Sequence, residues 1–503
     1  MPVSLVPAPR SLEVGDGQLT LDVQATVSAP GAAAGSADTL RSAFGLPLPA
    51  AESGTDATVR LTVDEALGEE AYRLRIAADG LTLTAGSAAG LFYGTQTLRQ
   101  LLPAEQLTTP TPPITLPALT IEDEPAFGWR GAMVDTGRHF IPLPDLRRFI
   151  DSLALHKLNT LHLHLSEDQG WRFEVKKWPK LTRVGSQRAE TVVGHARTSK
   201  EYDGTPHGGF YSQDELRELV DYAAARFVRI VPEIDLPGHT QAARAAYPEL
   251  GYDGAQHDVM TTWGISKHVM RVDEPGLAFA RDVLAELMDV FPSPFVHIGG
   301  DECPKDEWEA SEIARSQLAE LGLSDMNALQ SWFTGQLTEF IEGHGRRLVG
   351  WDEILEGGDL PPKVVVMSWR GMKPGIEAAK AGLDVVMASN SHTYFDYLQG
   401  DPADEPLGIG GDIRLDQAYA FEPVPAELTD EQAGHIIGVQ GQLWTEYMPD
   451  ARHLEYMSYP RLAALAEVGW TYRDRGDFAD FRSRLDTHVE RLRALGVNFR
   501  PLD

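Results

Sequence analysis

The sequence predicts a (β/α)8 barrel preceded by a small α+β domain. From about residue 130 onward, short apolar runs alternate with amphipathic segments, and eight of these runs can form strands. The chain contains no G-x-G-x-x-G or Walker pattern of the kind that a doubly wound α/β sheet usually carries. Eight strand–helix units over roughly 350 residues therefore favour a TIM barrel with insertions over an open sheet.

The expected first domain covers residues 1–120. Residues 58–63 and 71–76 alternate as strands, and Asp79-Gly80 predicts a hairpin turn into 81–84. A helix is expected over residues 88–101. A linker is expected at the proline-rich stretch that follows, which contains Pro103, Pro110, Pro112, Pro113 and Pro117. Residues 121–503 then form the expected catalytic barrel and its C-terminal helix.

The eight barrel strands are expected at residues 131–135, 159–165, 228–234, 295–298, 347–351, 364–369, 384–388 and 436–443. Amphipathic segments separate most of them. Residues 212–227 open with Ser212 and Glu215 in the spacing of a capping box, and residues 275–291 form a second clear helix. Chain length alone allows two or three domains with a large core.

Composition narrows the class of partner. A net charge of −30 argues against nucleic acid and against an anionic membrane surface. The single cysteine, Cys303, excludes an internal disulfide framework, and its neighbouring carboxylates disfavour a nucleophilic thiolate. No apolar run has the length of a membrane span, and the first residues show no basic region followed by a long apolar core. We therefore expect a cytoplasmic protein, or the mature form of a secreted one.

Catalytic residues of a TIM barrel lie at the C-terminal ends of its strands. These ends carry carboxylates, histidines, an arginine and tryptophans: Asp135, Arg138, His139, Glu167, Asp168, Trp171, Glu233, Asp235, His239, Asp301, Glu302, Trp351, Asp352, Glu353, Trp369, His392, Tyr394, Asp396, Trp444 and Glu446. Tryptophan faces can stack on pyranose rings while carboxylates bind the hydroxyls, so the combination favours a sugar site. One tryptophan alone is more often core, and one acid alone is as often a helix cap.

The stretch 295–304 carries the strongest catalytic signal. An apolar run ends in Gly299 and Gly300, which are followed by Asp301 and Glu302. Neighbouring side chains of a regular strand point to opposite faces, but glycines let the backbone bend, so both carboxylates can enter one pocket. Paired carboxylates can differ in pKa, one ionised and one protonated, as general-acid catalysis requires. The competing interpretation is a helix cap followed by a solvated acid.

His162 and His164 share one face of the second expected barrel strand. With His239 and Asp301 they could form the site of a metal hydrolase. The carboxylates at the strand ends suffice for acid–base chemistry, so we favour histidines in the barrel interior that hydrogen-bond to their neighbours. We expect no metal and no cofactor.

Six stretches in order resemble the β-N-acetylhexosaminidases of glycoside hydrolase family 20. They cover residues 135–140, 161–171, 231–239, 297–302, 350–353 and 444–446. Residues 90–98 also resemble the small α+β domain that precedes the barrel in this family, so the resemblance covers nearly the whole chain. The number and order of the motifs argue strongly against a chance match.

The resemblance implies an exo-acting, retaining mechanism in which the substrate's own 2-acetamido oxygen attacks the anomeric carbon and forms an oxazolinium intermediate. Glu302 would protonate the leaving oxygen and then activate water. Asp301 would orient the acetamido N–H, Tyr394 would bind the acetamido oxygen, and His239 would lie behind Glu302. Substrate binding would involve the pocket walls Trp351, Trp369 and Trp444 and the hydroxyl-binding residues Arg138, Asp396 and Glu446.

One residue departs from the family pattern, because Glu167 stands where an aspartate usually partners the histidine. Three other functions stay open at this point. One is an ordinary retaining glycosidase with Glu302 as acid and Asp235 or Glu446 as nucleophile. The others are a sugar-binding protein on an inactive barrel and the metal hydrolase. The expected partners are oligosaccharides ending in GlcNAc or GalNAc.

Overall fold

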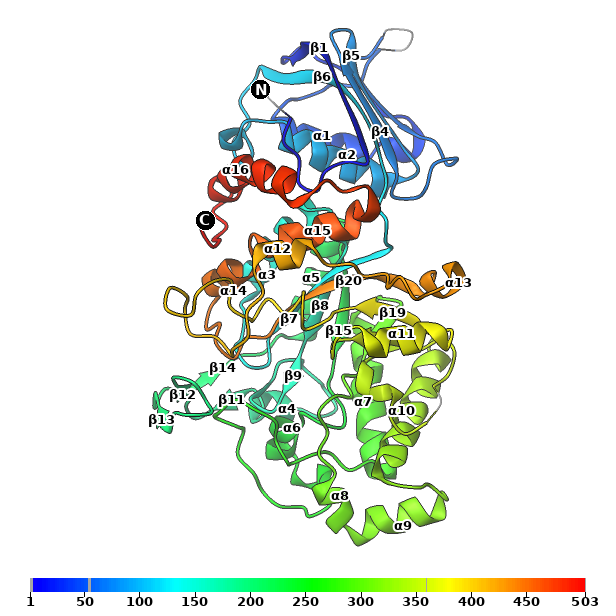
Figure 1. Ribbon diagram of the computed structural model, residues 1–503, viewed down its shortest axis with the longest axis vertical. Coiled ribbons are helices and arrows are strands. Elements are labelled where there is room, and N and C mark those ends of the chain that lie inside the picture. The colour runs from blue at the N-terminus through cyan, green and yellow to red at the C-terminus, as the bar shows by residue number, and fades with distance from the viewer. Residues whose placement is uncertain (1–2, 53–55, 359, 503) are drawn as a thin grey trace.

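The computed structural model describes residues 3–52, 56–358 and 360–502. A small α+β domain lies at one end of the molecule and a (β/α)8 barrel forms the rest (Figure 1). The small domain contains a six-stranded sheet in the order β1-β6-β4-β5-β3-β2. Its elements are β1 (Ser11–Leu21), β2 (Val27–Ser28), β3 (Val59–Val63), β4 (Tyr72–Ala77), β5 (Gly80–Ala85), β6 (Ile114–Asp123), α1 (Ser36–Phe44) and α2 (Ala88–Gln100), with the short 3-10 turns η1 (Gly31–Ala33) and η2 (Ala104–Gln106).

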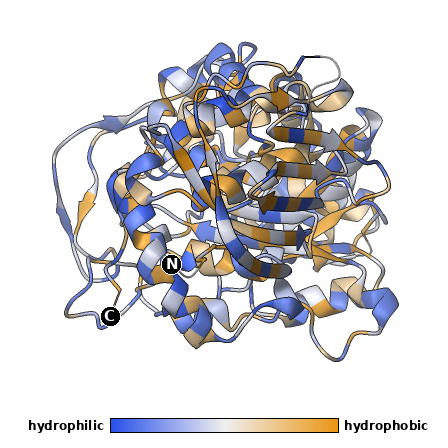
Figure 2. Cartoon of the chain, turned by 90° about the horizontal axis from the view of Figure 1, so that it is seen from above, coloured by the Kyte–Doolittle hydropathy of each residue, from blue (hydrophilic) through white to orange (hydrophobic). Residues whose placement is uncertain are grey.

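The sheet alternates hydrophobic and hydrophilic residues because one face packs on the helices, as the colouring of the strands in Figure 2 shows. The hairpin expected at Asp79-Gly80 is the antiparallel pair β4–β5. The expected linker is wrong in part, since β6 pairs with both β1 and β4. Pro117 is tolerated within β6 because it lies opposite Gln18, where the β1 register shifts.

All eight expected barrel strands are confirmed, and they close in the order β7-β8-β15-β16-β17-β18-β19-β20, all parallel. Apolar side chains of a second core, among them Val231, Val349 and Met367, fill the barrel interior. The strands are β7 (Trp129–Asp135), β8 (Thr160–His164), β15 (Arg229–Glu233), β16 (Phe295–His297), β17 (Arg347–Trp351), β18 (Val365–Ser368), β19 (Asp384–Met387) and β20 (Ile436–Leu443).

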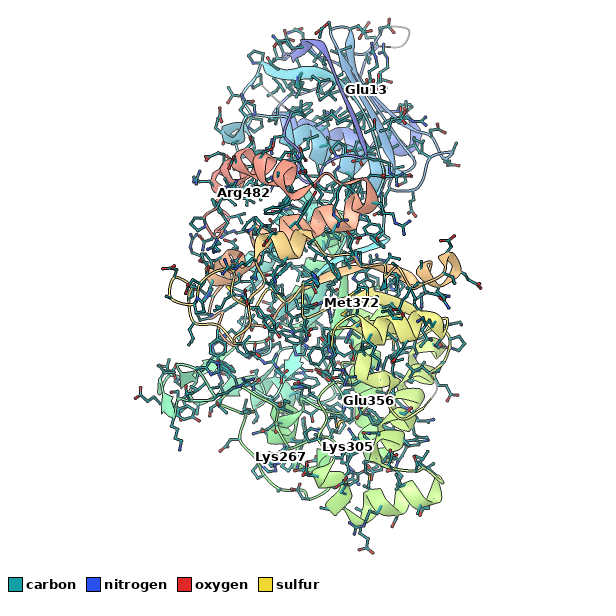
Figure 3. All side chains as sticks on the ribbon, in the orientation of Figure 1. Glu13, Lys267, Lys305, Glu356, Met372 and Arg482 are labelled. Atoms are coloured by element: carbon teal, nitrogen blue, oxygen red, sulfur yellow. The ribbon has the colours of Figure 1, made fainter. Side chains whose placement is uncertain are left out.

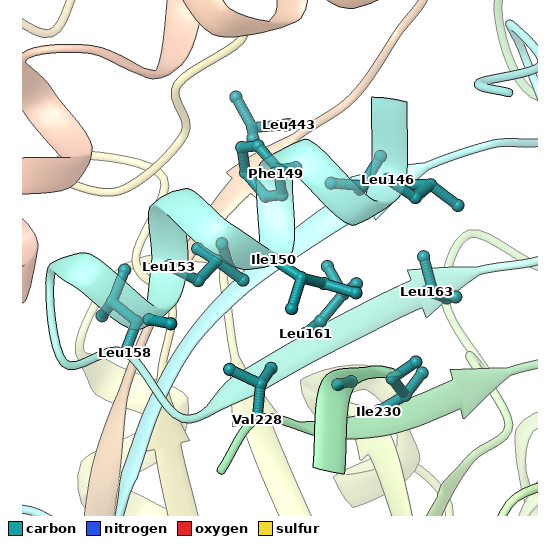
Figure 4. Packing of buried hydrophobic residues seen from close by; sticks show 14 of the residues in the cluster. Leu146, Phe149, Ile150, Leu153, Leu158, Leu161, Leu163, Val228, Ile230 and Leu443 are labelled. Carbon is teal, nitrogen blue, oxygen red and sulfur yellow. The ribbon is translucent and has the colours of Figure 1, made fainter. Parts of the chain in front are cut away.

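Amphipathic helices cover the outside of the barrel. In α3 (Leu143–Leu155), apolar residues spaced three or four apart pack on β8, as Figure 4 shows for Ile150 and Leu161. Ser212 caps α5 (Gln213–Ala224) in the expected capping box with Glu215. The other helices are α4 (Lys180–Arg183), α6 (Gln241–Ala246), α7 (Glu274–Val290), α8 (Asp306–Ala310), α9 (Glu312–Glu320), α10 (Met326–Gly343), α11 (Lys373–Lys380), α12 (Leu415–Tyr419), α13 (Asp430–Ala433), α14 (Ala451–Ser458), α15 (Arg461–Trp470) and α16 (Phe478–Ala494).

Insertions after the second barrel strand contain short strand pairs, and the C-terminal helix joins the two domains. The insertion strands are β9 (Ser166–Glu167), β10 (Gly170–Trp171), β11 (Gln187–Arg188), β12 (Val192–Val193), β13 (Glu201–Tyr202) and β14 (His207–Gly208); three short 3-10 turns are η3 (Pro248–Leu250), η4 (Asp352–Leu355) and η5 (Tyr472–Asp474). From α16, Arg484 donates to the carbonyl of Leu5 and Arg491 to that of Gln100. Across the described residues, no helix combines the length and the apolar character needed to span a bilayer.

Candidate active site

The backbone after β16 bends so that Asp301 and Glu302 enter one pocket. Gly299 and Gly300 adopt positive φ angles of 67° and 94°, and Glu302 follows at 44°. Gly299 is also required sterically, because an added Cβ would lie 1.9 Å from Asp235 Oδ1. The amide of Gly300 donates to that same oxygen at 3.1 Å. Asp235, on the loop after β15, therefore fixes the bend that presents the two carboxylates.

His239 contacts the carboxylate pair from the neighbouring loop. Its Nε2 lies 3.7 Å from Asp301 Oδ2 and 3.6 Å from Glu302 Oε2. On the other side of the ring, Nδ1 lies 2.7 Å from Glu167 Oε1. Burial lowers the pKa of His239, but the carboxylates of Glu167, Asp168 and Glu302 together outweigh it and raise that pKa well above its ordinary value. The structure thus places His239 in contact with Glu167, the residue that differs from the family pattern.

Asp301 and Asp235 are both buried and close together. Burial, and then the charge of Asp235, raises the pKa of Asp301 well above its ordinary value. Burial also raises the pKa of Asp235 to about 7. Two carboxyl groups that resist ionising together retain a proton between them near neutral pH.

Arg138 lies at the opposite side of the pocket among three acids. Its guanidinium lies 3.1 Å from Asp135, 3.1 Å from Glu167 and 3.4 Å from Glu446. Its central carbon lies 5.0 Å from the centre of the Trp444 ring, in cation–π contact. In the described part of the chain, several buried polar atoms of this site have no hydrogen-bond partner: Arg138 Nε, Asp301 Oδ1, Asp396 Oδ1 and Glu446 Oε2. Such atoms suit a polar ligand, because a buried polar group without a partner is costly.

Aromatic side chains form the remaining walls. Trp351 donates its indole N–H to Glu233 at 2.9 Å, and its ring centre lies 5.6 Å from that of Trp444. Trp369 donates to Glu353 at 2.9 Å and stacks on Tyr394 with ring centres 5.9 Å apart. Hydrogen bonds thus fix the orientation of both tryptophans, so their faces are preorganised.

Two further carboxyl groups, those of Asp396 and Glu446, line a small cavity beside Trp444. Burial, and then Glu446, raises the pKa of Asp396 well above its ordinary value, and burial raises that of Glu446 although Arg138 opposes it. Burial and the charge of Asp396 also raise the pKa of Tyr394, so its hydroxyl stays protonated and able to donate. The site therefore offers neutral donors as well as charged acceptors to a hydroxyl-rich ligand.

Some strand-end residues do not join the site. Trp171 is fully buried, donates to the carbonyl of Phe173 and packs near Phe279, so its expected place in the sugar site is wrong. His392 is half-buried and stacks on the buried Phe421. Asp352 accepts from the amide of Trp369 and supports the loop instead of facing the pocket.

Sequence reasoning missed Lys305 and Arg370. Both line a cavity of about 350 Å³ together with Glu302 and Glu353, and Figure 3 labels Lys305 and Glu356 in this region. The position of Arg370, directly after Trp369 at a strand end, could have signalled it. A larger cavity of about 690 Å³ lies between the small domain and the barrel, lined by residues such as Tyr93 and Phe227. It contains none of the clustered catalytic carboxylates, so size alone does not locate the chemistry.

A closed parallel barrel whose C-terminal face gathers paired carboxylates, a buried arginine and three tryptophans is an arrangement suited to binding a sugar. A family model described as "Glycosyl hydrolase family 20, catalytic domain" matches residues 127–473, and one described as "Glycosyl hydrolase family 20, domain 2" matches residues 3–124. The chain belongs to glycoside hydrolase family 20.

Named relatives agree with this membership. A beta-hexosaminidase of Porphyromonas gingivalis is 41% identical over 510 residues, which cover 99% of this chain and 64% of that protein. This chain thus spans less than two thirds of that relative. A beta-N-acetylhexosaminidase of Cellulomonas fimi is 37% identical over 508 residues, 97% of this chain and 94% of that protein.

Solved structures show the same architecture. The GH20 beta-N-acetylhexosaminidase of Streptomyces coelicolor superposes with a TM-score of 0.85 at 33% identity, over 100% of this chain and 98% of that one. A Streptomyces plicatus beta-hexosaminidase variant in complex with its product GlcNAc gives 0.84 at 32% identity, over 100% and 97% of the two chains.

Proposed function

We propose that the chain is an exo-acting, retaining β-N-acetylhexosaminidase that removes terminal GlcNAc or GalNAc from oligosaccharides and glycoconjugates. The observation that carries the proposal is the convergence of Asp301, Glu302 and His239 beside the tryptophan walls. Relatives named as beta-hexosaminidases, and a related structure in complex with GlcNAc, support the substrate class.

The proposed reaction uses the substrate's acetamido oxygen as the nucleophile. As that oxygen bonds to the anomeric carbon, Glu302 gives its proton to the leaving oxygen and the glycosidic bond breaks. Asp301 accepts from the acetamido N–H and stabilises the positive charge of the oxazolinium. Glu302, now a carboxylate, takes a proton from a water molecule as that water attacks the anomeric carbon. The attack opens the oxazolinium ring, and the product keeps the anomeric configuration of the substrate.

Other residues of the site bind and orient the substrate. Tyr394 donates to the acetamido oxygen, and Trp351, Trp369 and Trp444 enclose the acetamido methyl and the sugar ring. Arg138, Asp396 and Glu446 bind the hydroxyls of the terminal residue through the buried polar atoms that lack protein partners. Because these groups line a buried end of the pocket, the sugar that enters is a chain end, which accounts for exo action.

An enzymic nucleophile is harder to accommodate. Asp235 is fully buried, lies against Gly299 and accepts from the amide of Gly300, so Asp301 separates it from a bound sugar. Glu446 is held by Arg138 at 3.4 Å. Asp235 is therefore not free to attack an anomeric carbon beside Glu302, which favours the acetamido group in that role.

The test compares hydrolysis of an aryl β-N-acetylglucosaminide with that of the matching aryl β-glucoside. We expect cleavage of the acetamido substrate alone, and a loss of roughly a hundredfold or more in Glu302→Gln. Asp301→Asn is the next variant, expected to lose rate on the same substrate. Equal cleavage of both glycosides by the wild type would mean that an enzymic carboxylate, not the acetamido group, is the nucleophile.

A further inference from the structure

The His-x-His pair of β8 lies inside the barrel, directly beneath the proposed active site. Both side chains are fully buried and both contact Glu233, at the end of the next strand. His162 Nε2 lies 3.0 Å from Glu233 Oε2, and His164 Nδ1 lies 2.5 Å from the same oxygen. The other carboxylate oxygen lies 3.0 Å from His297 Nδ1 and accepts from Trp351.

These distances do not suit a metal at this cluster. A tetrahedral zinc ion with bonds near 2.0 Å holds its ligand atoms about 3.3 Å apart. His162, His164 and Glu233 instead approach one another at hydrogen-bonding distance. A hydrogen bond between His164 Nδ1 and Glu233 accounts for the shortest of these contacts without an ion.

The two histidines differ in how they are protonated. Gln440 donates to His162 Nδ1 at 3.0 Å, so that ring uses one nitrogen as acceptor and stays neutral. Burial lowers the pKa of His162 to about 4. His164 has a carboxylate at each nitrogen: Glu233 at Nδ1 and, at 3.2 Å from Nε2, Glu167. Both of its nitrogens must carry hydrogens to satisfy these acceptors, which makes it an imidazolium.

His164 therefore lies between two functional parts of the site. At one end, Glu233 holds the indole of Trp351, a proposed wall of the acetamido pocket. At the other, Glu167 contacts His239 at 2.7 Å, and His239 faces the proposed acid Glu302 at 3.6 Å. An unbroken chain of polar contacts joins the pocket wall to the group behind the acid.

We propose that His164 is a positioning residue that couples the Trp351 wall to the Glu167–His239 pair behind Glu302. The inference rests on the proposed hexosaminidase function and deepens it. His164 touches no substrate; it acts by keeping Glu233 and Glu167 apart, charged and correctly oriented. Without its positive charge, the buried Glu233 carboxylate would lose its protonated partner and Glu167 would lose one of three. That loss is costly for buried carboxylates and is relieved by movement or by proton uptake.

Several charged or protonatable groups surround His164, and they determine in which direction the pH profile should move when His164 is replaced. They are Glu233 on β15, Glu167 on β9, Asp135 on β7, Arg138 after β7, the neutral His162 on β8, and Asp235 and His239 after β15, while the Trp444 ring lies 5.0 Å away. Burial lowers the pKa of His164, but the Glu233 and Glu167 carboxylates raise it well above its ordinary value. Replacing it with a neutral residue makes the site one charge more negative, and an acid in a more negative site keeps its proton to higher pH.

The experiment compares His164→Gln with the matched control His162→Gln, on an aryl β-N-acetylglucosaminide across pH 4 to 9. Both variants remove a buried ring that contacts Glu233, but only His164 carries the charge and reaches Glu167. For His164→Gln we expect kcat to fall on the order of tenfold and the alkaline limb of the profile to move up by roughly half a pH unit or more. For His162→Gln we expect the alkaline limb of the profile to stay at the pH of the wild type.

Equal behaviour of the two variants, or an unmoved limb in His164→Gln, overturns the proposal. If the wild type cleaves no acetamido substrate, the proposed function has failed, which is a separate result. Neutron diffraction of the wild type at pH 7 gives a second measurement that survives misfolding of a variant. Hydrogen on both nitrogens of His164 and on one nitrogen of His162 supports the proposal, and a singly protonated His164 refutes it.

Discussion

The buried pair His156 and His488 predicts a specific loss of stability in acid. His156 lies at the end of α3 and His488 within α16, and their Nε2 atoms lie 2.8 Å apart. His156 Nδ1 donates to the carbonyl of Ser152 at 2.7 Å, so its Nε2 accepts from His488. Burial lowers the pKa of His156 to about 4. Burial, then His156 and the nearby Arg491, lowers that of His488 further.

The lowered pKa values determine how the free energy of unfolding changes with pH. The unfolded chain binds these protons first, near pH 6.5, so the stability from keeping His156 neutral is present above pH 6.5 and is lost as pH falls towards 4. With those two pKa values, His156 alone removes about 2 kcal/mol from the free energy of unfolding at pH 5 and about 3 kcal/mol at pH 4.

His156→Gln tests this magnitude, because the glutamine oxygen can still accept from His488 but cannot titrate. Urea denaturation at pH 7 and pH 5 gives the difference in unfolding free energy between wild type and variant. We expect that difference to change by about 2 kcal/mol in favour of the variant at pH 5. His344→Gln, at an exposed site after α10, is the control. If the His156→Gln and His344→Gln differences change alike, His156 is not held neutral by burial and the reasoning is refuted.

The other predictions concern the site and its support. Gly299→Ala should abolish measurable turnover while the barrel still folds, because its Cβ would overlap Asp235; circular dichroism and kcat together check this. Trp171→Ala should reduce the free energy of unfolding by about 3 to 5 kcal/mol, with kcat of the folded enzyme changed less than about twofold, since the ring packs in the core. Glu167→Asp should lower kcat/KM on the order of tenfold, because the shorter chain cannot keep its 2.7 Å contact with His239; steady-state kinetics would contradict this if the variant equalled the wild type. Activity measured with excess chelator should equal activity measured without it. A loss of activity on adding chelator would favour the metal-hydrolase hypothesis.

Barrel strands were predictable because a strand buried on both faces is a short apolar run, whatever its neighbours are. All eight runs named from the sequence are strands of the closed barrel. Strand β6 was not predictable in the same way, because Pro113 and Pro117 mark it as a linker. Only the pairing with β1, including its register shift opposite Pro117, shows why the sheet tolerates a proline there.

The direction in which a side chain points was the weaker part of the site prediction. Trp171 and Trp444 both follow barrel strands, yet one packs in the core and the other lies under Arg138. A strand end specifies a place but not an orientation, because the loop that follows decides which face the residue occupies. Glycines give better information, since Gly299 and Gly300 readily adopt the positive φ angles of the bend that precedes Asp301 and Glu302.

Glu167 shows why a residue that departs from a family pattern is best interpreted through its contacts. From sequence, the extra methylene could only be a source of doubt about the histidine partner. In the structure one oxygen of Glu167 lies 2.7 Å from His239 and the other lies 3.1 Å from Arg138 and 3.2 Å from His164. The longer side chain thus reaches three cationic or protonatable groups at once. Burial raises the pKa of Glu167, but Arg138, His239 and His164 outweigh it and keep that pKa well below its ordinary value. An ionised Glu167 can hold His239 and compensate Arg138 together, so the proposed acid relay and the proposed sugar-binding arginine share one counter-ion, and a change at either end affects the other.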